Sequence, residues 1–343
     1  MIPAGQHYRL PVDYSFVSSV KFFYYESEEL DIIRRVKPGE KILVFVESLA
    51  KLRKLRDILK QDGHTDVVCL CSRYRKEAKE FDQLKDVLQD HQLLHTVTLT
   101  TSVLYNGVDI KDPALKHIVS ELWNPLVNAQ ILGRKRPTTP EDTCDVYFMQ
   151  YGQARLKGIF EQIKTYQFEP TLAFRKKAGD ESAWQAYLND DKTQQVLSKS
   201  RTVVLDARKG RYCLRKRAYV QALLEASILE RMIRDGYRKT LLRDIDPNML
   251  EKLKPLDPPL LLEYLENHLE EERLVEDWKK IFLEMGHIYN RKDGHVKKSP
   301  PGFETAQEWL NDYGYVLHSK QSMKGVLRKK MVWWVTKEST NDG

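Results

Sequence analysis

The chain has 343 residues, of which 41% are hydrophobic and 31% are charged, and its formal net charge is +7 at pH 7. This length leaves room for two or three domains that each bury a core. The sequence holds no run of about 18 apolar residues, the length that a membrane-spanning helix needs. Its first residues also lack the basic-then-apolar layout of a signal peptide. We therefore expect a cytoplasmic protein with no membrane partner.

Cysteine and histidine are placed in a way that argues against a metal site. No C-x-x-C pair occurs among the four cysteines, Cys69, Cys71, Cys144 and Cys213. His287 and His295 have no plausible set of further ligands near them in the sequence. We expect no metal ligands in this chain, and we expect the thiols to be reduced and to act as small hydrophobic side chains.

The positive charge is concentrated in one part of the chain. Residues 201–243 contain 12 Lys and Arg against 4 Asp and Glu, whereas residues 246–284 contain 5 against 11. A basic block beside an acidic one predicts one surface that meets a polyanion and another that does not.

Residues 1–37 are expected to form a connector arm. A short helix from Glu28 to Val36 is predicted there, and Pro38 with Gly39 ends it. From Lys41 onward the pattern changes, because short apolar runs begin to alternate with amphipathic stretches.

Residues 38–152 are predicted to form one α/β domain. The apolar runs that we interpret as strands cover residues 41–48, 67–72, 95–101, 117–122 and 144–150. Helices are predicted between them, at about 49–62, 74–90 and 125–135. Strands that alternate with helices at this spacing predict a parallel sheet of five strands with helices on both faces.

Two further regions are expected after this domain. Residues 153–250 are predicted to be helical with one basic hairpin at about 201–215, and Gly236 interrupts a long amphipathic helix. Residues 251–343 are predicted to form helices followed by a basic hairpin, an arrangement that is winged-helix-like. Trp333 and Trp334 in that hairpin either form a small core with one wet face or stack on bases.

Hydroxyl and acidic residues gather where the predicted strands end. In a parallel sheet, ligands bind at the carboxyl ends of the strands. The residues expected at that edge are Ser48, Ser72, Thr100, Thr101 and the loop that carries Gly107 and Asp109.

Four segments in order resemble a known motor domain. The runs KILVFVES, VVCLCS, TVTLTTSVLYNGVDI and QILGRKRP are similar to consecutive motifs of the second RecA-like domain of superfamily 2 helicases of the DEAD/DEAH type. The resemblance covers residues 41–150, about a third of the chain, and TTSVLYNGVDI is its most specific part. Residues 1–37 are similar to the connector that enters this domain in such helicases.

The resemblance implies a shared ATP site. One lobe of such a motor cradles the phosphates and Mg²⁺, and the other supplies cations to the transition state. It implies that Arg134 and Arg136 are arginine fingers and that Asp109 accepts hydrogen bonds from the ribose, with Gly107 and Gln130 beside the nucleotide. It also implies that Ser48, Ser72, Thr100 and Thr101 face a nucleic-acid backbone.

The sequence departs from the family pattern at one position. The pattern Gln-x-x-Gly-Arg-x-x-Arg would place its last arginine at Pro137, and the nearest arginine is Arg136, one residue early. Either Arg136 takes the role through a different turn, which we favour, or Arg134 works alone. Lys135, between them, is expected to be a solvated surface charge.

The first lobe of the motor has no counterpart in this sequence. The chain contains no G-x-x-x-x-G-K-[ST] phosphate loop, and no apolar strand precedes its one Asp-Glu doublet, Asp180–Glu181. We therefore expect no efficient ATP hydrolysis by this chain alone. It resembles either the C-terminal part of a longer helicase or a subunit that completes the site of another chain, so a first RecA-like lobe is an expected partner in cis or in trans.

Nucleic acid, either DNA or RNA, is the other expected partner. The basic hairpin and the residues after it are the expected contacts, namely Arg208, Lys209, Arg211, Arg215, Lys216 and Arg217. Two other functions stay open. One is a non-catalytic binding module that keeps a degenerate helicase fold. The other is a doubly wound enzyme for a small molecule, for which no catalytic constellation is visible.

Overall fold

A computed structural model describes residues 13–71, 82, 84–101, 104, 108–256, 260–286, 299–311, 315–323 and 327–337. The chain divides into two compact units. Unit 1 comprises Met1–Tyr14, Leu122–Gly133 and Gln150–Leu253, and unit 2 comprises Ser15–Glu121, Arg134–Met149 and Lys254–Gly343. Within the described residues, no helix has the length and apolar character to cross a membrane.

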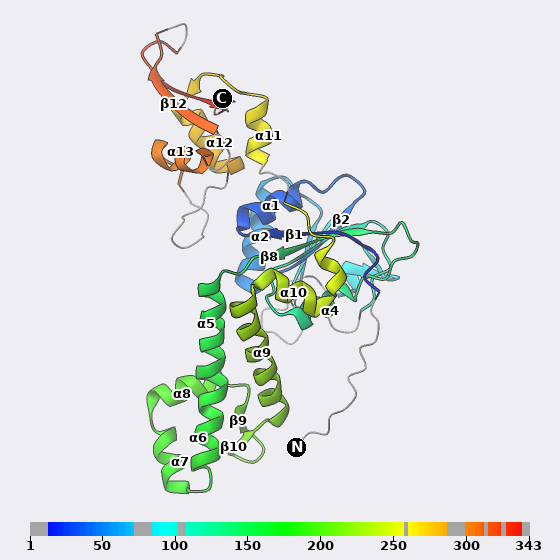
Figure 1. Ribbon diagram of the computed structural model, residues 1–343, viewed down its shortest axis with the longest axis vertical. Helices are drawn as coiled ribbons and strands as arrows, with labels where there is room; N and C mark the ends of the chain where they lie inside the picture. The colour runs from blue at the N-terminus through cyan, green and yellow to red at the C-terminus, as the bar shows by residue number, and fades with distance from the viewer. Residues whose placement is uncertain are drawn as a thin grey trace. The chain divides into compact units, whose positions relative to one another are not determined.

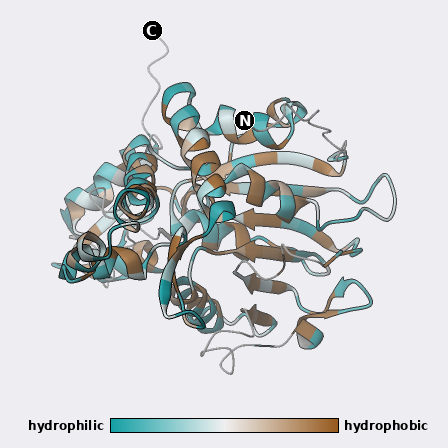
Figure 2. Ribbon diagram, turned by 90° about the horizontal axis from the view of Figure 1, so that it is seen from below, coloured by the Kyte–Doolittle hydropathy of each residue, from teal (hydrophilic) through white to brown (hydrophobic). Residues whose placement is uncertain are grey.

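A six-stranded parallel sheet forms the centre of unit 2. Its order is β1 (Val17–Phe23), β8 (Cys144–Met149), β7 (Leu115–Ser120), β2 (Lys41–Phe45), β6 (Val97–Thr100) and β3 (Val67–Leu70). The strands are mostly hydrophobic along their length, as expected of a sheet that is covered by other elements (Figure 2). The predicted α/β fold with a parallel sheet is confirmed, and each of the five predicted strands is present.

The sixth strand, β1, corrects the expectation that residues 1–37 form only a connector arm. Val20 and Phe23 are fully buried, and β1 pairs in parallel with β8 along the sheet edge. The Lys254 amide donates to the Val20 carbonyl at 2.9 Å. The serines and the lysine of VSSVKFF hide this strand in the sequence, because an edge strand with one partly polar face lacks a continuous apolar run.

The first turns of two helices beside the sheet are explained by the residues that cap them. Helix α1 (Glu26–Arg34) begins two residues earlier than expected, since the Glu28 carboxylate accepts hydrogen bonds from the Tyr24 and Tyr25 amides at 2.6 and 3.1 Å. Helix α2 (Leu49–Gln61) is capped by Ser48, whose hydroxyl accepts from the Lys51 amide. Its leucines face the core, as predicted.

The helix expected at 74–90 is confirmed only in part where the structure describes it. Helix α3 covers only Leu84–Val87, and a small hairpin of β4 (Leu88–Gln89) and β5 (Gln92–Leu93) follows. Asp90 and His91 form its turn with φ of 50° and 66°, which no helix allows. Residues 74–81 lie outside the described residues.

Unit 1 contains a pair of long helices. Helix α5 (Gln153–Ile163) and helix α9 (Lys216–Asp235) run side by side (Figure 1). The remaining helical elements are α4 (Pro125–Leu132), η2 (Lys164–Phe168), α6 (Glu169–Lys177), α7 (Glu181–Leu188), α8 (Asp191–Ser198), α10 (Tyr237–Ile245) and η3 (Pro247–Leu250). Gly236 separates α9 from α10 with φ of 95°, so the predicted interruption is confirmed.

The predicted basic hairpin of unit 1 is also present. Strand β9 (Val203–Asp206) pairs in antiparallel with β10 (Arg211–Leu214), and Gly210 lies in the turn with φ of 60°. A cluster of Trp184, Leu197 and Val203 anchors its base.

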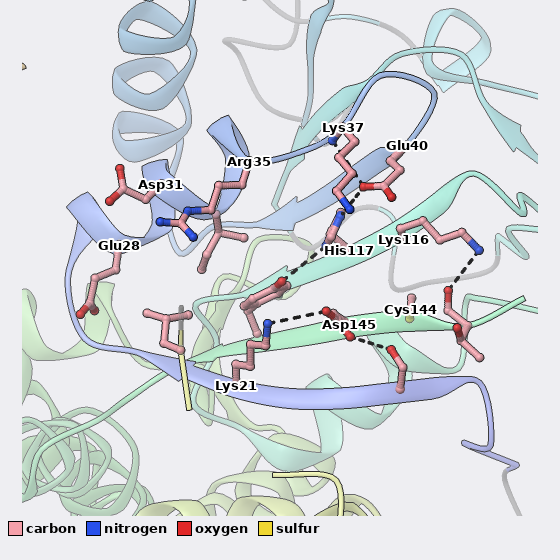
Figure 3. Close-up of a pocket in the computed structure, with 15 residues that line it drawn as sticks. Lys21, Glu28, Asp31, Arg35, Lys37, Glu40, Lys116, His117, Cys144 and Asp145 are labelled. Carbon is pink, nitrogen blue, oxygen red and sulfur yellow. Dashed lines mark hydrogen bonds and ion pairs between the residues drawn. The ribbon is translucent and has the colours of Figure 1, made fainter. Parts of the chain in front are cut away.

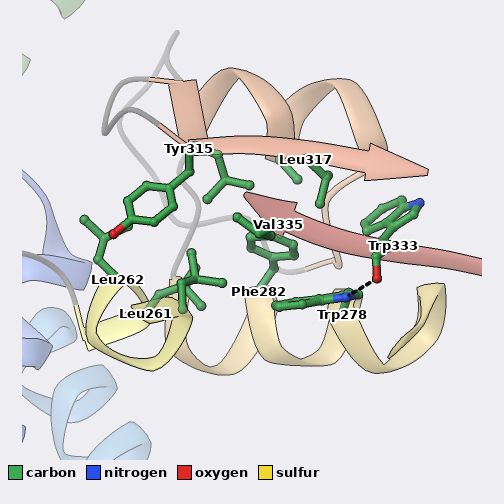
Figure 4. Close-up of a cluster of buried hydrophobic side chains, with 11 residues drawn as sticks. Leu261, Leu262, Trp278, Phe282, Tyr315, Leu317, Trp333 and Val335 are labelled. Atoms are coloured by element: carbon green, nitrogen blue, oxygen red, sulfur yellow. Dashed lines mark hydrogen bonds between the residues drawn. The ribbon is translucent and has the colours of Figure 1, made fainter. Parts of the chain in front are cut away.

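The last part of unit 2, residues 260–337, has a core of its own. Its elements are α11 (Leu260–Glu266), β11 (Arg273–Leu274), α12 (Val275–Ile281), η4 (Phe282–Gly286), α13 (Phe303–Asn311), β12 (Tyr315–Gln321) and β13 (Met331–Lys337). The three strands form an antiparallel sheet in the order β11-β13-β12. Figure 4 shows Trp278, Phe282, Trp333 and Val335 packed between this sheet and the helices.

Candidate nucleotide and nucleic-acid site

Two segments that are far apart in the sequence lie side by side in unit 2. The Ile110 amide donates to the Arg134 carbonyl at 2.7 Å, and the Arg136 amide donates to the Ile110 carbonyl at 2.8 Å. These bonds make residues 134–136 a short extended segment parallel to Ile110. The backbone of the loop that carries Asp109 is therefore held against the backbone that carries Arg134.

Two of the expected nucleotide-binding residues contact each other directly. Nε of Arg136 lies 3.1 Å from Oδ1 of Asp109, and the two side chains are 49% and 43% exposed. Arg134 is half-buried. Because side chains alternate in an extended segment, Lys135 points away from its two arginine neighbours.

Lys135 is buried, so its prediction as a solvated surface charge is wrong. Its Nζ lies 2.6 Å from Oδ1 of Asp142 and donates to the Asp112 carbonyl at 3.1 Å, and both side chains of the ion pair are at most 1% exposed. Burial raises the pKa of Asp142, but the hydrogen bond and charge of Lys135 and the Thr138 amide outweigh it, so this pKa lies below its ordinary value. Asp142 is thus a buried carboxylate that needs its cation.

A second buried carboxylate holds the other side of the loop. Asp112 accepts from Nζ of Lys41 at 3.0 Å, from the Leu93 amide at 2.9 Å and from the Ala114 amide at 2.9 Å. Together with Lys135 and Asp142, it forms a polar scaffold directly behind Asp109 and Arg136. Such satisfied buried networks make a segment rigid.

The hydroxyls at the strand ends have structural partners. The Ser48 hydroxyl caps α2. Thr100 is fully buried and donates to the carbonyls of Leu70 and Thr101, and Thr101 is buried as well. Both residues are buried in this structure, so their exposure gives no support to the expectation that Thr100 and Thr101 face a nucleic acid. Ser72 and Gly107 lie outside the described residues.

The basic block of unit 1 has the exposure that a polyanion contact needs. Within the described residues, no ion pair involves any of the six exposed side chains Arg208, Lys209, Arg211, Arg215, Lys216 and Arg217. They line the β9–β10 hairpin and the first turn of α9. Gln130 is exposed near the end of α4.

An acidic cluster at the carboxyl ends of β2 and β7 was missed in the sequence. Glu29 and Glu121 are fully buried and both pair with Nζ of Lys51, which lies 2.9 Å from Glu29. The Glu121 carboxylate also accepts from the Glu47 amide at 2.9 Å. Burial raises the pKa of Glu29, although Lys51 counteracts this effect. Glu29 lies on α1, far from the others in sequence, so no spacing rule could reveal the cluster.

A pocket of about 500 Å³ is lined by residues of α1, β1, β7 and β8 (Figure 3). Asp145 accepts from the hydroxyls of Ser18 and Ser19 at 2.6 and 2.7 Å, and Nε2 of His117 lies 3.1 Å from Glu40. Since these groups satisfy one another, they form a paired polar face of the sheet. They are at the opposite end of the strands from Glu121 and Thr101. Burial raises the pKa of the Cys144 thiol, which also lines this pocket, to about 12, so it is no nucleophile.

The side chains of the described residues give no support for a metal site. Within the described parts of unit 1 and unit 2, no three His, Cys, Asp or Glu side chains are grouped so that they could hold a metal ion. His287 and His295 lie outside the described residues.

Neither a protein-family model nor a curated protein matches this chain. Among solved structures, S. cerevisiae Dbp5 bound to RNA and ADP BeF3 is similar with a TM-score of 0.33 and 16% identity, over 44% of this chain and 40% of that one. The C-terminal domain of the DEAD-box protein Dbp5 is similar with a TM-score of 0.32 and 16% identity, over 43% of this chain and 84% of that one. The E. coli DEAD-box protein SrmB, bound to RraA, is similar with a TM-score of 0.30 and 14% identity, over 39% of this chain and 76% of that one.

The chain spans less than half of the Dbp5 chain that is bound to RNA. Likeness at this level carries no weight for activity, so the case for a function rests on the residues themselves.

Proposed function

We propose that this chain provides the second motor lobe and a nucleic-acid-binding region of an ATP-dependent superfamily 2 helicase. The observation that carries the proposal is the pairing of Ile110 with the Arg134–Arg136 segment, which holds an acidic loop and an arginine-rich turn together. A guanidinium beside a carboxylate offers a cation for phosphate and an acceptor for ribose hydroxyls. A separate lobe would supply the phosphate loop and the ligands for Mg²⁺.

We propose different roles for the two arginines. Arg136 is bound to Asp109, so it acts as the group that orients this carboxylate towards a ribose. Arg134, which stands at the first arginine of the Gln-x-x-Gly-Arg pattern, is the proposed arginine finger, whereas the sequence alone favoured a role for Arg136 at the phosphate as well. Gly107 and Gln130 remain proposed neighbours of the nucleotide.

ATP turnover in the presence of a first lobe tests this assignment. Without a lobe that carries a phosphate loop, the chain should show no ATPase above background. With that lobe supplied in cis or in trans, Arg134→Ala should lower kcat by about 1000-fold, the size expected of an arginine finger. Arg136→Ala should mainly raise KM, because it acts through Asp109. Equal kcat values for Arg134→Ala and the wild type would remove Arg134 from the mechanism.

The six exposed cations of the β9–β10 hairpin and α9 support nucleic-acid binding by unit 1. Each phosphate that they neutralise should add about 0.7 to the slope of log K against log salt for a single strand. Replacing Arg208, Lys209 and Arg211 by alanine should therefore lower that slope by about 2. An unchanged slope would exclude this hairpin as the contact.

One observation favours the second candidate function, a binding module without a motor role. Pro137 replaces the expected arginine, and Arg136 is already paired with Asp109. Titration with ADP separates the two functions. A motor lobe should lose nucleotide affinity in Asp109→Ala, whereas a binding module should hold nucleic acid and ignore ADP with and without this substitution.

A further inference from the structure

The β12–β13 hairpin carries a strongly positive charge that the proposed function does not use. Residues 315–337 contain six Lys and Arg and no Asp or Glu. Lys337 pairs with Glu266 at 2.9 Å, and Lys320 pairs with Glu272. Within the described residues, no ion pair involves the three exposed side chains at the end of the hairpin, Arg328, Lys329 and Lys330.

The backbone presents these three cations in a defined geometry. The Ser322 amide donates to the Lys330 carbonyl at 2.9 Å, and the Lys329 amide donates to the Ser322 carbonyl at 2.7 Å. Gln321 Nε2 donates to the Lys329 carbonyl at 3.1 Å, and Lys329 itself has φ of 64°. A left-handed residue is costly for lysine and persists only where the surrounding contacts hold it. The cations therefore project from a rigid support, which reduces the entropy lost on binding.

The two faces of β13 differ in burial. Trp333 packs inward against Phe303 with ring centroids 5.6 Å apart, and its carbonyl accepts from Trp278 Nε1 at 2.6 Å. Trp334 lies on the other face and is half-buried. Trp333 therefore belongs to the core cluster, and Trp334 lies outside it.

Trp334 is part of an aromatic and cationic stack. The His318 ring lies parallel to its indole, with centroids 4.9 Å apart and planes 17° apart, and Lys320 Nζ lies 4.7 Å from the indole ring. Two exposed apolar side chains, Met323 at 73% and Met331 at 51%, are at the same end of the hairpin as the free cations. Stacked rings, apolar groups and unpaired cations on one hairpin match the needs of a strand with exposed bases.

We propose that the β12–β13 hairpin is a second nucleic-acid site, which binds the backbone of a single strand through Arg328, Lys329 and Lys330 and adds a base to the His318–Trp334 stack. Cations alone would suit any polyanion. The cross-strand His318–Trp334 pair stabilises the hairpin, and its aromatic rings can also stack with a ligand that has flat rings. This site extends the proposed function to a second contact on the strand, and it does not depend on ATP.

Binding of a labelled oligo-dT and a labelled oligo-U to the full chain tests the backbone contact. Replacing Arg328, Lys329 and Lys330 together by alanine should lower the slope of log K against log salt by about 2 and weaken binding about 100-fold at 0.1 M salt. Alanine at three exposed lysines elsewhere, Lys60, Lys157 and Lys192, is the matched control and should leave both values unchanged. Equal affinity and slope for the triple variant and the wild type would overturn the proposal.

The stack is tested with a second pair of variants and a second ligand. His318→Ala and Trp334→Leu should each weaken binding of the oligonucleotide about tenfold without changing the salt slope, and neither should affect an abasic strand. His318→Ala retains the tryptophan, so it keeps the test valid if Trp334→Leu fails to fold. Poly-glutamate at equal charge concentration should not displace the oligonucleotide. If it does, and if neither variant changes the affinity for the oligonucleotide, the hairpin binds an acidic protein instead. Loss of ATPase in Arg134→Ala is independent of these results, so this site and the motor role fail separately.

Discussion

Replacing Lys135 by methionine should open the segment that carries Arg134 and Arg136. Methionine has a similar length but no donor, so Asp142 loses its cation at 2.6 Å and the Asp112 carbonyl loses its hydrogen bond. Removing one partner of a buried ion pair costs about 3–5 kcal/mol. The amide and hydroxyl of Thr138 still donate to Asp142, so we expect the lower end, about 3 kcal/mol.

Hydrogen exchange at the Ile110 and Arg136 amides measures this cost where it acts. Both amides bond across the two segments, and 3 kcal/mol corresponds to a loss of protection of about 100-fold. Lys111→Met, at an exposed lysine beside Asp112, is the matched control and should leave protection unchanged. Adding Asp142→Leu to Lys135→Met should restore part of the protection, because it removes the unpaired buried charge. If the two amides are as strongly protected from exchange in Lys135→Met as in Lys111→Met, the ion pair does not hold this segment.

Two other predictions concern buried charge in unit 2. Lys51→Met should lower the free energy of unfolding by about 3–5 kcal/mol, because Glu29 and Glu121 would lose their shared cation. The control Lys54→Met, at a more exposed lysine, should lower it by less than 1 kcal/mol in urea unfolding. Similar urea midpoints for the two variants would contradict this prediction. Burial raises the pKa of Asp145, but hydrogen bonds from two serines and the charge of Lys21 bring it below its ordinary value of 3.8. The stability that Asp145 adds is therefore present above the unfolded pKa and is lost as the pH falls through the lower folded pKa. The urea midpoints of the wild type and Asp145→Asn should differ at pH 7 and converge below pH 4. A difference in midpoint that does not depend on pH would count against this role of Asp145.

The sequence alone determined the elements whose signal is local. Alternating apolar runs and amphipathic stretches predicted all five central strands and the helix from Leu49, because a strand buried on both faces needs a continuous apolar run. Glycine marked the break at Gly236, where the chain needs a positive φ. Both basic hairpins were also predicted from residues that are neighbours in the chain.

Only the tertiary structure decided which side chains are available at the proposed site. Lys135 is hidden because Asp142 and Asp112 approach it from other segments, and Thr100 is hidden because its hydroxyl bonds to the neighbouring strand. Glu29 reaches its cluster from a helix that precedes the sheet. Burial and ion pairing depend on contacts between distant residues, and a periodic pattern reports only on the contacts that a residue makes within its own strand or helix.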